Sequence, residues 1–445
     1  MKDFNKKKIA IIGKAVEGES SAKFLKGKGA DVTILDISQG ESYLDGLDKY
    51  DLIVRSPGIK ISKLITHNSE QITSKITSQT KLFFDMCPCP IIGVTGTKGK
   101  GTTSTLIYEM LKKSGKDVYL GGNIGKAPLE FIEQLNSSAV VVLELSSFQL
   151  QDLHKSPHIG VMLMVTSDHL DGSNNRNYHD SVEEYISAKR NILRFQTKSD
   201  FAILNRDYPP SIESDILTEG KVYFVSRERE VEEGCFARDG KIVIRANGEN
   251  IEVVKTSELG LRGEHNFENA CSAALAAFLE GVKVEDIKEV LKTFKGLEHR
   301  LELVGKVNGV EYYNDSFSVV PEAAIAAIES FENPEILILG GSSKNSNFEE
   351  LGQVLSSKKN IKAIIGIGKE WERIKAEMSP NSKILLIEGA DSMEKIVLAA
   401  SKIALSGDVV LLTPACASFD MFKNYKDRGD QFKHQVIALK QNESN

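Results

Sequence analysis

One glycine-rich segment of the sequence points most clearly to a chemical function. It follows an apolar run typical of a buried strand and contains Lys100. Residues 91–103 begin with a β-branched run, continue with glycines at a spacing of three, and end with Lys100 and hydroxyl residues. Glycines let backbone N–H groups approach a phosphate, and a helix N-terminus favours negative charge. The segment therefore predicts a nucleotide phosphate-binding loop in which Lys100 reaches the outer phosphates.

This segment departs from the strict pattern G-x4-G-K-[ST] at two positions. Val94 stands where the first glycine would be, and Gly101 follows the lysine in place of Ser or Thr. The alternative is a glycine-rich turn with a surface lysine. It is disfavoured because the loop lies between a strand pattern and the helical pattern of Leu106, Ile107 and Met110.

Polar residues follow three further apolar runs, which we interpret as strands at 117–120, 139–143 and 159–165. Asn123, Glu144 and His169 come after these runs in turn. In an open parallel sheet, ligand-binding groups gather beyond the carboxyl ends of the strands. A carboxylate and an imidazole beside a triphosphate predict a magnesium site at this edge.

Lys189 lies on a helical pattern that follows His169. A lysine there is ordinarily a solvated charge, which is the interpretation that the residues alone favour. If the side chain points into the magnesium site, its ammonium cannot bind the metal. Carbamylation by carbon dioxide would convert it into a carboxylate that can.

The N-terminal segment alternates strands with helical patterns. Strands are expected at 8–12, 31–35 and 51–54, with a helix at 20–26, and they predict a small parallel sheet. Gly13 and Gly18 are five residues apart, so the dinucleotide pattern G-x-G-x-x-G is absent. Asp36 nevertheless ends the second strand, where an acid can take ribose hydroxyls. A nucleotide-like ligand and a purely structural lobe both remain open.

The C-terminal segment repeats this alternation. Asn308-Gly309 predicts a two-residue hairpin, and strands at 335–339, 362–367, 383–387 and 408–412 alternate with helical patterns. A second doubly wound sheet follows from this. The loops 340–344 and 413–418 each come after a strand and could bind an anion. Arg300, at the junction with the central segment, could meet a phosphate when domains close. Asn266 and Asn269 either cap an alanine-rich helix or contact an adenine.

The overall composition excludes several classes of protein. The 445 residues are 41% hydrophobic and 27% charged, with a net charge of -6 and no long basic run, so a nucleic-acid partner is not expected. No stretch approaches the ~18 apolar residues of a membrane span. Five scattered cysteines include Cys87 and Cys89, whose spacing is not C-x-x-C. A reduced, cytoplasmic protein is expected.

Five sequence blocks resemble the Mur ligase family, and the similarity extends over the whole chain. They are residues 121–125, 143–150, 263–266, 314–316 and 414–429. The phosphate loop by itself is shared with folylpolyglutamate synthases. The resemblance implies an α/β protein with three domains. These are a Rossmann-like UDP-substrate domain at 1–88, a central P-loop ATPase-like domain at 89–296, and a Rossmann-like glutamate domain at 297–445.

The resemblance also implies an ATP-dependent amide ligase of peptidoglycan precursor synthesis. ATP would phosphorylate the carboxylate of UDP-N-acetylmuramoyl-L-alanine, and glutamate would attack the acyl phosphate. D-glutamate is expected because block 414–429 is closest to the family members that add it. ATP, two magnesium ions and a monomeric chain complete this expectation.

Site residues follow from the resemblance, position by position. It places the ATP phosphates on Gly96, Thr97, Lys98, Gly99, Lys100, Gly101 and Thr102. It makes metal ligands of Thr102, Glu144, His169 and a carbamylated Lys189. It assigns adenine to Asn269, ribose to Asp315, the γ-phosphate to Arg300, and the transferred phosphate or muramoyl substrate to Asn123. It assigns the UDP group to Lys14, Ala15, Asp36, Ser56, Pro57 and Gly58. The glutamate carboxylates fall to Lys344, Ser418 and Tyr425.

Two departures from the family pattern bear on function. Gly101 replaces the hydroxyl residue that usually binds magnesium, so Thr102 or water must supply that oxygen. Phe317 replaces a lysine of the block Asn-Asp-Ser-Lys-Ala-Thr-Asn, which leaves an L-glutamate-adding relative open. A folylpolyglutamate synthase is disfavoured because the N-terminal lobe would have no purpose. A catalytically silent nucleotide-binding protein is the alternative from another class.

Overall fold

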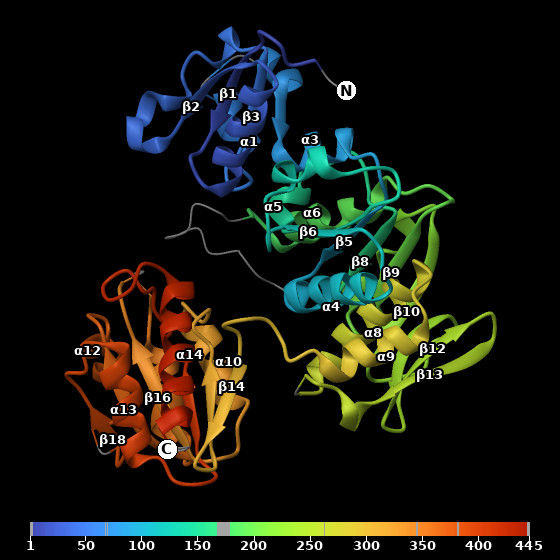
Figure 1. Ribbon diagram of the computed structural model, residues 1–445. Coiled ribbons are helices and arrows are strands. Elements are labelled where there is room, and N and C mark those ends of the chain that lie inside the picture. The colour runs from blue at the N-terminus through green and yellow to red at the C-terminus, as the bar shows by residue number, and fades with distance from the viewer. Residues whose placement is uncertain are drawn as a thin grey trace. The chain divides into compact units, whose positions relative to one another are not determined.

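The protein, described from a computed structural model, is an α/β protein with three sheets (Figure 1). The structure describes residues 3–66, 68, 70–166, 179–261, 263–343, 346–380 and 382–442. The chain forms two compact units, Met1–Phe294 and Lys295–Asn445. The first unit holds two of the sheets and the second unit holds the third. The expected α/β class is therefore confirmed.

The N-terminal sheet has four parallel strands in the order β2-β1-β3-β4. Its elements are β1 (Lys8–Ile12), α1 (Val16–Gly27), β2 (Asp31–Leu35), β3 (Leu52–Arg55), α2 (Ile61–Thr66), β4 (Ile76–Ser78) and α3 (Gln79–Met86). Successive side chains of a strand point to opposite faces. Ile9 and Ile11 accordingly pack with α1, and Ala10 and Ile12 pack on the other face. Helix α1 begins four residues earlier than the sequence pattern predicts.

The central sheet has nine strands in the order β13-β12-β11-β10-β9-β8-β5-β7-β6. The strands are β5 (Ile91–Thr95), β6 (Val118–Gly122), β7 (Val140–Glu144), β8 (Ile159–Met162), β9 (Phe201–Asn205), β10 (Lys221–Ser226), β11 (Gly234–Arg238), β12 (Lys241–Ala246) and β13 (Glu249–Lys255). Strands β12 and β13 are joined at Asn247-Gly248, both of which have positive φ. Strand β11 was not predicted, because its glycine and arginine ends weaken the strand pattern.

Helices cover both faces of the central sheet (Figure 1). One face packs against α4 (Lys100–Lys113), α8 (His265–Leu279) and α9 (Val284–Thr293). The opposite face packs against α3 and α6 (Val182–Arg194). The short helices α5 (Ser147–Leu150) and α7 (Pro209–Ile212) follow β7 and β9. Because both faces are covered, the parallel strands read as continuous apolar runs.

The C-terminal unit contains a six-stranded sheet in the order β14-β15-β19-β16-β17-β18. Its strands are β14 (Glu302–Val307), β15 (Val310–Asn314), β16 (Glu335–Gly340), β17 (Ile361–Ile367), β18 (Leu385–Ile387) and β19 (Val409–Leu412). The predicted hairpin joins β14 to β15, and the other pairs are parallel. Helices α10 (Pro321–Glu329), α11 (Glu349–Ser357) and α12 (Trp371–Ala376) cover one face, and α13 (Met393–Ile403) and α14 (Tyr425–Asn442) cover the other.

None of the helices in the described part of the chain has the length and apolar character that crossing a bilayer requires.

A buried ion pair joins the N-terminal sheet to the central sheet. Arg55, whose side chain is fully buried, ends β3 and donates a 2.7 Å hydrogen bond to Asp152, in the segment that follows α5. The Arg55 guanidinium also donates to the backbone oxygens of Pro57 (2.9 Å) and Ile59 (3.1 Å). Each charge is thus paired inside the first unit, which is the condition for burying it without a large penalty.

We expect Arg55→Ala to destabilise the first unit by about 3–5 kcal/mol, because it leaves the Asp152 carboxylate buried without its partner. Urea unfolding followed by far-ultraviolet circular dichroism measures this loss. Trp371, the one tryptophan of the chain, lies in the second unit, so its fluorescence reports that unit separately and should not change.

Lys28→Ala is the matched control. Lys28 also links the two sheets, through an ion pair with Glu133, but both side chains are partly exposed to solvent. Exposed pairs contribute ~0–1 kcal/mol. An Arg55 variant no less stable than the Lys28 variant would contradict a structural role for the buried pair.

Candidate active site

The phosphate loop follows β5 and ends at the first residue of α4. Gly99 precedes that helix with φ +86°, a left-handed conformation that favours glycine. A Cβ at this position would lie 2.3 Å from Oδ1 of Asn269. The loop is therefore pressed against α8, and the residue expected to contact adenine lies directly beside it. Asn269 accepts from the Thr103 hydroxyl at 3.3 Å and donates to Asn266 at 3.0 Å.

The Lys100 ammonium lies over the loop that precedes it. Its Nζ donates to the backbone oxygens of Gly96 (3.1 Å) and Thr97 (3.0 Å). These bonds hold a positive charge against the helix N-terminus, which itself favours an anion. Thr97 is fixed in turn by a 2.7 Å backbone bond from its N–H to Met164.

Positive charge also gathers at the side of this loop. Burial and the nearby charges of Arg227 and Lys98 lower the pKa of His265, at the start of α8. The positive charges of Arg227 and Lys98 near His265 suit a polyanion such as a nucleotide triphosphate. Arg227 was not singled out from the sequence, because an arginine in a charged run after a strand indicates no particular site.

Glu144 and Asn123 meet at the carboxyl ends of neighbouring strands. Glu144 ends β7 and lies opposite Val94 of β5, while Asn123 follows β6. Asn123 donates its backbone N–H to the Glu144 carbonyl (2.9 Å) and its amide to Oε1 (3.3 Å). Gly122 permits this approach, because a Cβ there would be 2.2 Å from the Glu144 carbonyl oxygen. The Glu144 side chain is 7% exposed. Its carboxylate thus lies at the edge of the sheet where the sequence placed it.

Lys189 points toward the phosphate loop rather than into solvent. It is 2% exposed and its Nζ donates to the Gly96 carbonyl at 2.8 Å. The same ammonium lies 4.6 Å from the ring centroid of Tyr185. Tyr185, one helical turn earlier, places its hydroxyl 2.9 Å from that of Thr97. The interpretation of Lys189 as a solvated surface charge is therefore wrong.

Tyr185 and His179 belong to this cluster and were not predicted. His179 is buried, lies 2.9 Å from the Ser147 hydroxyl, and stacks on Phe148 at 4.6 Å between ring centroids. Its ring also meets Tyr185 edge to face at 5.5 Å. The aromatic packing orients α6, and with it Lys189, toward the loop. A tyrosine one turn before a lysine was the available sequence signal.

The residues expected to bind the UDP group meet at the carboxyl edge of the N-terminal sheet. The Lys14 N–H donates to Asp36 at 3.1 Å, and a Cβ on Gly13 would be 2.5 Å from the Ser56 hydroxyl oxygen. Ala15 immediately precedes α1. Arg55 donates to the carbonyls of Pro57 and Ile59 and so holds the loop that contains Gly58. Arg55 itself was not predicted, because buried arginine has no sequence pattern.

Arg300, in the C-terminal unit, lies between two residues in the left-handed region, His299 (φ 62°) and Leu301 (φ 44°). Such conformations cost about 1–2 kcal/mol each outside glycine. Asn314 and Asp315 maintain them. The Asn314 amide lies 2.9 Å from Nδ1 of His299, and Asp315 accepts the Leu301 N–H at 3.1 Å. This strained turn presents an exposed guanidinium 4.7 Å from the Phe317 ring centroid.

Asp315 is 2% exposed and bonded within its own unit. Besides the Leu301 N–H, its carboxylate accepts hydrogen bonds from the hydroxyls of Ser318 and Thr413. Burial raises its pKa from the ordinary 3.8 to about 6. Contact of Asp315 with a ribose stays a prediction, since one carboxyl oxygen already accepts from the turn that carries Arg300 and the other accepts from the two hydroxyls.

Tyr425, Phe317 and Ser418 lie at the ends of the loops of the C-terminal sheet. Tyr425 meets Phe317 edge to face at 5.2 Å, while Ser418 is buried. Arg428, fully buried and not predicted, ties these loops together. It donates to the Ser316 carbonyl (2.9 Å) and the Cys416 carbonyl (3.1 Å).

The structure gathers most of the predicted residues into groups, one at each sheet edge. Gly96 to Thr102, Asn123, Glu144, Lys189 and Asn269 adjoin the phosphate loop or the strand ends beside it. His169 and Lys344 lie outside the described residues. Within the described residues, no three His, Cys, Asp or Glu side chains come together as a metal site. The chemistry available at the central edge is phosphate binding by backbone N–H groups and two lysines beside one carboxylate.

Comparisons with known proteins connect this geometry to a family. Residues 94–277 match the Mur ligase middle domain, and residues 299–416 match the Mur ligase glutamate ligase domain. The chain is 38% identical to a UDP-N-acetylmuramoylalanine--D-glutamate ligase of Acetivibrio thermocellus, with 99% of both chains covered. It is 37% identical to the enzyme of the same name from Pelotomaculum thermopropionicum, again with 99% of both covered.

Solved structures share the fold at lower identity. The MurF ligase of Thermotoga maritima in complex with ADP superposes with a TM-score of 0.57 at 19% identity, covering 98% of this chain and 96% of that one. UDP-N-acetylmuramate-alanine ligase MurC of the same organism gives a TM-score of 0.58 at 16% identity, covering 97% and 99%.

The raised pKa of Asp315 predicts a pH-dependent stability. A carboxyl that holds its proton more tightly when folded contributes stability below pH 3.8 that is lost as the pH rises through about 6. Asp315→Asn removes this contribution. The unfolding free energy of the wild type minus that of the variant should therefore fall between pH ~4 and ~7, by up to about 3 kcal/mol. Urea unfolding followed by Trp371 fluorescence measures it.

Asp391→Asn serves as the control in the same unit. An ion pair with Lys395 lowers the pKa of Asp391, which is exposed, so its effect should be small and of opposite sign. Parallel pH profiles for the wild type and Asp315→Asn would show that the buried carboxyl does not titrate as described.

Proposed function

The chain belongs to the Mur ligase family, and from this premise we propose that it adds D-glutamate to UDP-N-acetylmuramoyl-L-alanine. The reaction consumes ATP, passes through an acyl phosphate, and belongs to peptidoglycan precursor synthesis. The observation that carries the proposal is the convergence of Lys100 and Lys189 on the carbonyl of Gly96, which directly follows β5, the strand paired with the one that ends in Glu144. Full-length identity to enzymes named as D-glutamate ligases supports the substrate.

The chemistry requires two anions to approach each other. An oxygen of the substrate carboxylate attacks the γ-phosphorus of ATP, and ADP leaves. The glutamate amine then attacks the carbonyl carbon of the acyl phosphate, forms the C–N bond and loses a proton. The tetrahedral intermediate that results expels phosphate and leaves the amide. Such steps need positioning and fixed positive charge rather than a covalent protein nucleophile. Lys100 and the loop N–H groups neutralise the phosphates during the first step. Arg300, which the C-terminal unit carries, stabilises the negative charge of the transferred phosphoryl group.

Magnesium suits part of the donor set. Glu144 offers a nearly buried carboxylate at the strand edge, and Thr102 offers a hydroxyl in the first turn of α4. Bound magnesium would supply charge neutralisation between the phosphate groups and the carboxylate. The Lys189 ammonium does not fit a metal, because it has only hydrogen-bond donors.

We propose that Lys189 is carbamylated in the active enzyme. The neutral amine adds to carbon dioxide and loses one proton, which gives a carbamate with two acceptor oxygens. This converts a buried donor that now contacts Gly96 into a carboxylate ligand beside the phosphate loop. Together with Glu144 and His169 it would hold the second of two magnesium ions.

The remaining substrates are assigned by domain. The UDP group belongs to the edge of the N-terminal sheet, at Lys14, Ala15, Asp36 and 56–58. The glutamate carboxylates bind to Lys344, Ser418 and Tyr425 of the C-terminal unit. The proposed domains are residues 1–88, 89–296 and 297–445. Phe317 packs against Tyr425 in place of the usual lysine. The Phe317 ring centroid also lies 4.7 Å from the Arg300 guanidinium.

The test is amide formation by the purified full chain. We expect ADP, phosphate and a new amide when Mg-ATP, UDP-N-acetylmuramoyl-L-alanine and D-glutamate are all present, and no turnover when any one is omitted. L-glutamate in place of D-glutamate tests the other enantiomer. A folate substrate tests the folylpolyglutamate alternative. No ADP under any of these conditions would support a silent nucleotide-binding protein.

Lys189→Ala tests the carbamate. We expect kcat to fall by about 10²–10³-fold, the loss typical when one preorganised electrostatic group is removed. Acetate or formate should restore part of the activity, because a short carboxylate can occupy the space of the carbamate. Lys198→Ala, which removes an exposed lysine just beyond α6, is the control and should keep full activity. Full activity of Lys189→Ala would remove carbamylation from the mechanism.

A further inference from the structure

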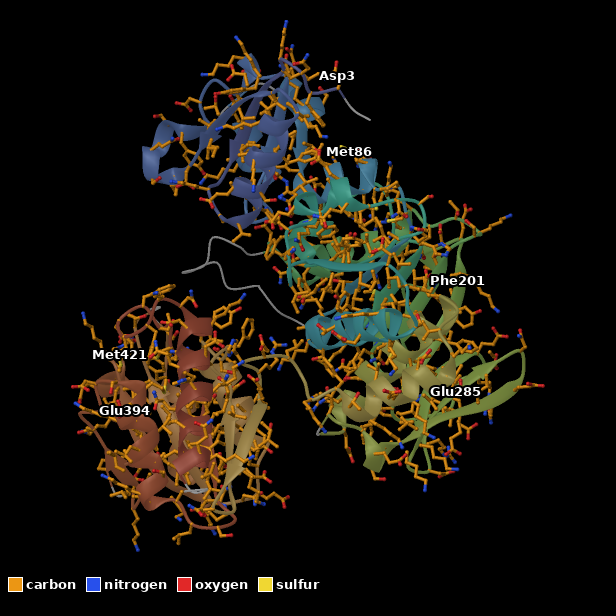
Figure 2. The ribbon with its side chains drawn as sticks, in the orientation of Figure 1. Asp3, Met86, Phe201, Glu285, Glu394 and Met421 are labelled. Atoms are coloured by element: carbon orange, nitrogen blue, oxygen red, sulfur yellow. The ribbon has the colours of Figure 1, made fainter. Side chains whose placement is uncertain are left out.

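Two cysteines lie where the N-terminal sheet passes into the central one. Cys87 follows α3, directly after Met86, which Figure 2 labels between the two parts of the first unit. Cys89 comes two residues before β5 begins, and its neighbours Pro88 and Pro90 are exposed. The far end of β5 leads into the phosphate loop, so the pair lies at the opposite end of that strand from the proposed active site.

The two sulfur atoms are within reach of each other. Their Sγ atoms are 3.6 Å apart, and the Cys87 Sγ also lies 3.5 Å from the Cys89 carbonyl oxygen. Both side chains are partly exposed. Cα atoms two residues apart are at most ~7 Å from each other, so the chain itself keeps the pair near the separation that disulfides use. Closing the bond requires the sulfur atoms to approach by about 1.5 Å.

The surroundings make the two thiols unequal. The hydrogen bond from Cys89 lowers the pKa of Cys87, whereas the same bond, burial and the charge of Asp117 raise the pKa of Cys89. The thiolate is the nucleophile in thiol–disulfide exchange. Cys87 is therefore the group that attacks first, and Cys89 is placed to attack the sulfur of Cys87 afterwards.

A second pair of thiols in the same unit differs from Cys87 and Cys89 in its exposure to solvent. Cys235 and Cys271 interact with each other, but both are fully buried, and burial raises the pKa of Cys271 well above its ordinary value. They lie in the core between β11 and α8. An oxidant that reacts through solvent can reach Cys87 and Cys89 but not this pair.

We propose that Cys87 and Cys89 form a redox-active dithiol that takes up a disulfide oxidant and closes to an internal disulfide. The Cys87 thiolate attacks one sulfur of a low-molecular-weight disulfide, which breaks that S–S bond and releases one thiol. The Cys89 thiol gives up its proton and attacks the Cys87 sulfur, which releases the second thiol. Two cysteine thiols are oxidised, and one external disulfide is reduced to two thiols.

This site is independent of the proposed ligase reaction. Both cysteines are free thiols in this structure, and the contacts described for their sulfur atoms are within the pair itself. Serine variants at either position should therefore keep the basal ligase activity. Oxidation constrains only residues 87–89, at the joint between the two sheets.

The test uses the full chain and oxidised glutathione, followed by alkylation of the unfolded protein and mass spectrometry of its peptides. The number of alkylatable cysteines should fall from five to three, with the lost pair in the peptide that contains Cys87 and Cys89. Dithiothreitol should restore all five. Loss of the Cys235–Cys271 pair instead, or no loss at oxidant concentrations that modify the unfolded chain, would overturn the proposal.

Two variants separate the steps. Cys89→Ser keeps a hydroxyl donor beside Cys87 but removes the resolving sulfur, so a stable mixed disulfide with one glutathione should accumulate on Cys87. Cys87→Ser should react more slowly, because burial and the charge of Asp117 still raise the pKa of the remaining thiol. Accumulation of the mixed disulfide in the wild-type chain would show that Cys89 does not resolve it, and would refute the internal disulfide.

Discussion

The parallel alignment of β5 with its neighbours is the constraint on which the central site depends. In a parallel sheet every strand releases its next residues at the same edge, and β5 lies between β7 and β8. The register that sets Val94 against Glu144 therefore also sets the phosphate loop beside that carboxylate. Shifting a strand by one residue would turn its side chains to the other face and away from the loop. The hydrogen-bonded backbone of the sheet thus determines where the Glu144 carboxylate and the phosphate loop lie relative to each other.

Helix packing adds the groups that strands cannot supply. Helix α8 presses Asn269 against Gly99, and α6 carries Lys189 to the Gly96 carbonyl. Tyr185, also on α6, adds a second contact between that helix and the loop. Its hydroxyl hydrogen-bonds Thr97, and its ring contacts the Lys189 ammonium. The loop is thus held from both faces of the sheet, and a nucleotide bound there would meet donors that are already fixed. Such preorganisation lowers the reorganisation needed during phosphoryl transfer.

Buried arginines perform the corresponding role at the other two sheet edges. Arg55 shapes the loop through Ser56 and Pro57, and Arg428 fastens the loops that bear Ser316 and Cys416. A guanidinium offers five donors in a fixed plane, so one side chain can satisfy several carbonyls of an irregular loop. Burial lowers the pKa of Arg428 to about 10, which still leaves it charged at neutral pH. In both places the charge orders backbone that faces a proposed substrate.

The amino-acid sequence determined whatever depends on local patterns. Apolar runs located the strands, Asn308-Gly309 located a hairpin, and the glycine–lysine loop indicated a phosphate site with Glu144 and Asn123 beside it. Only the tertiary structure decided which way Lys189 points, because rotating the helix by about half a turn would move the side chain from the loop to solvent. It alone identified Arg55, whose partner Asp152 is 97 residues away in the chain, and it alone set the sulfur atoms of Cys87 and Cys89 3.6 Å apart. The physical reason is that periodicity in a sequence reports which face of an element is buried, whereas pairing of polar groups depends on segments that meet only when the chain folds.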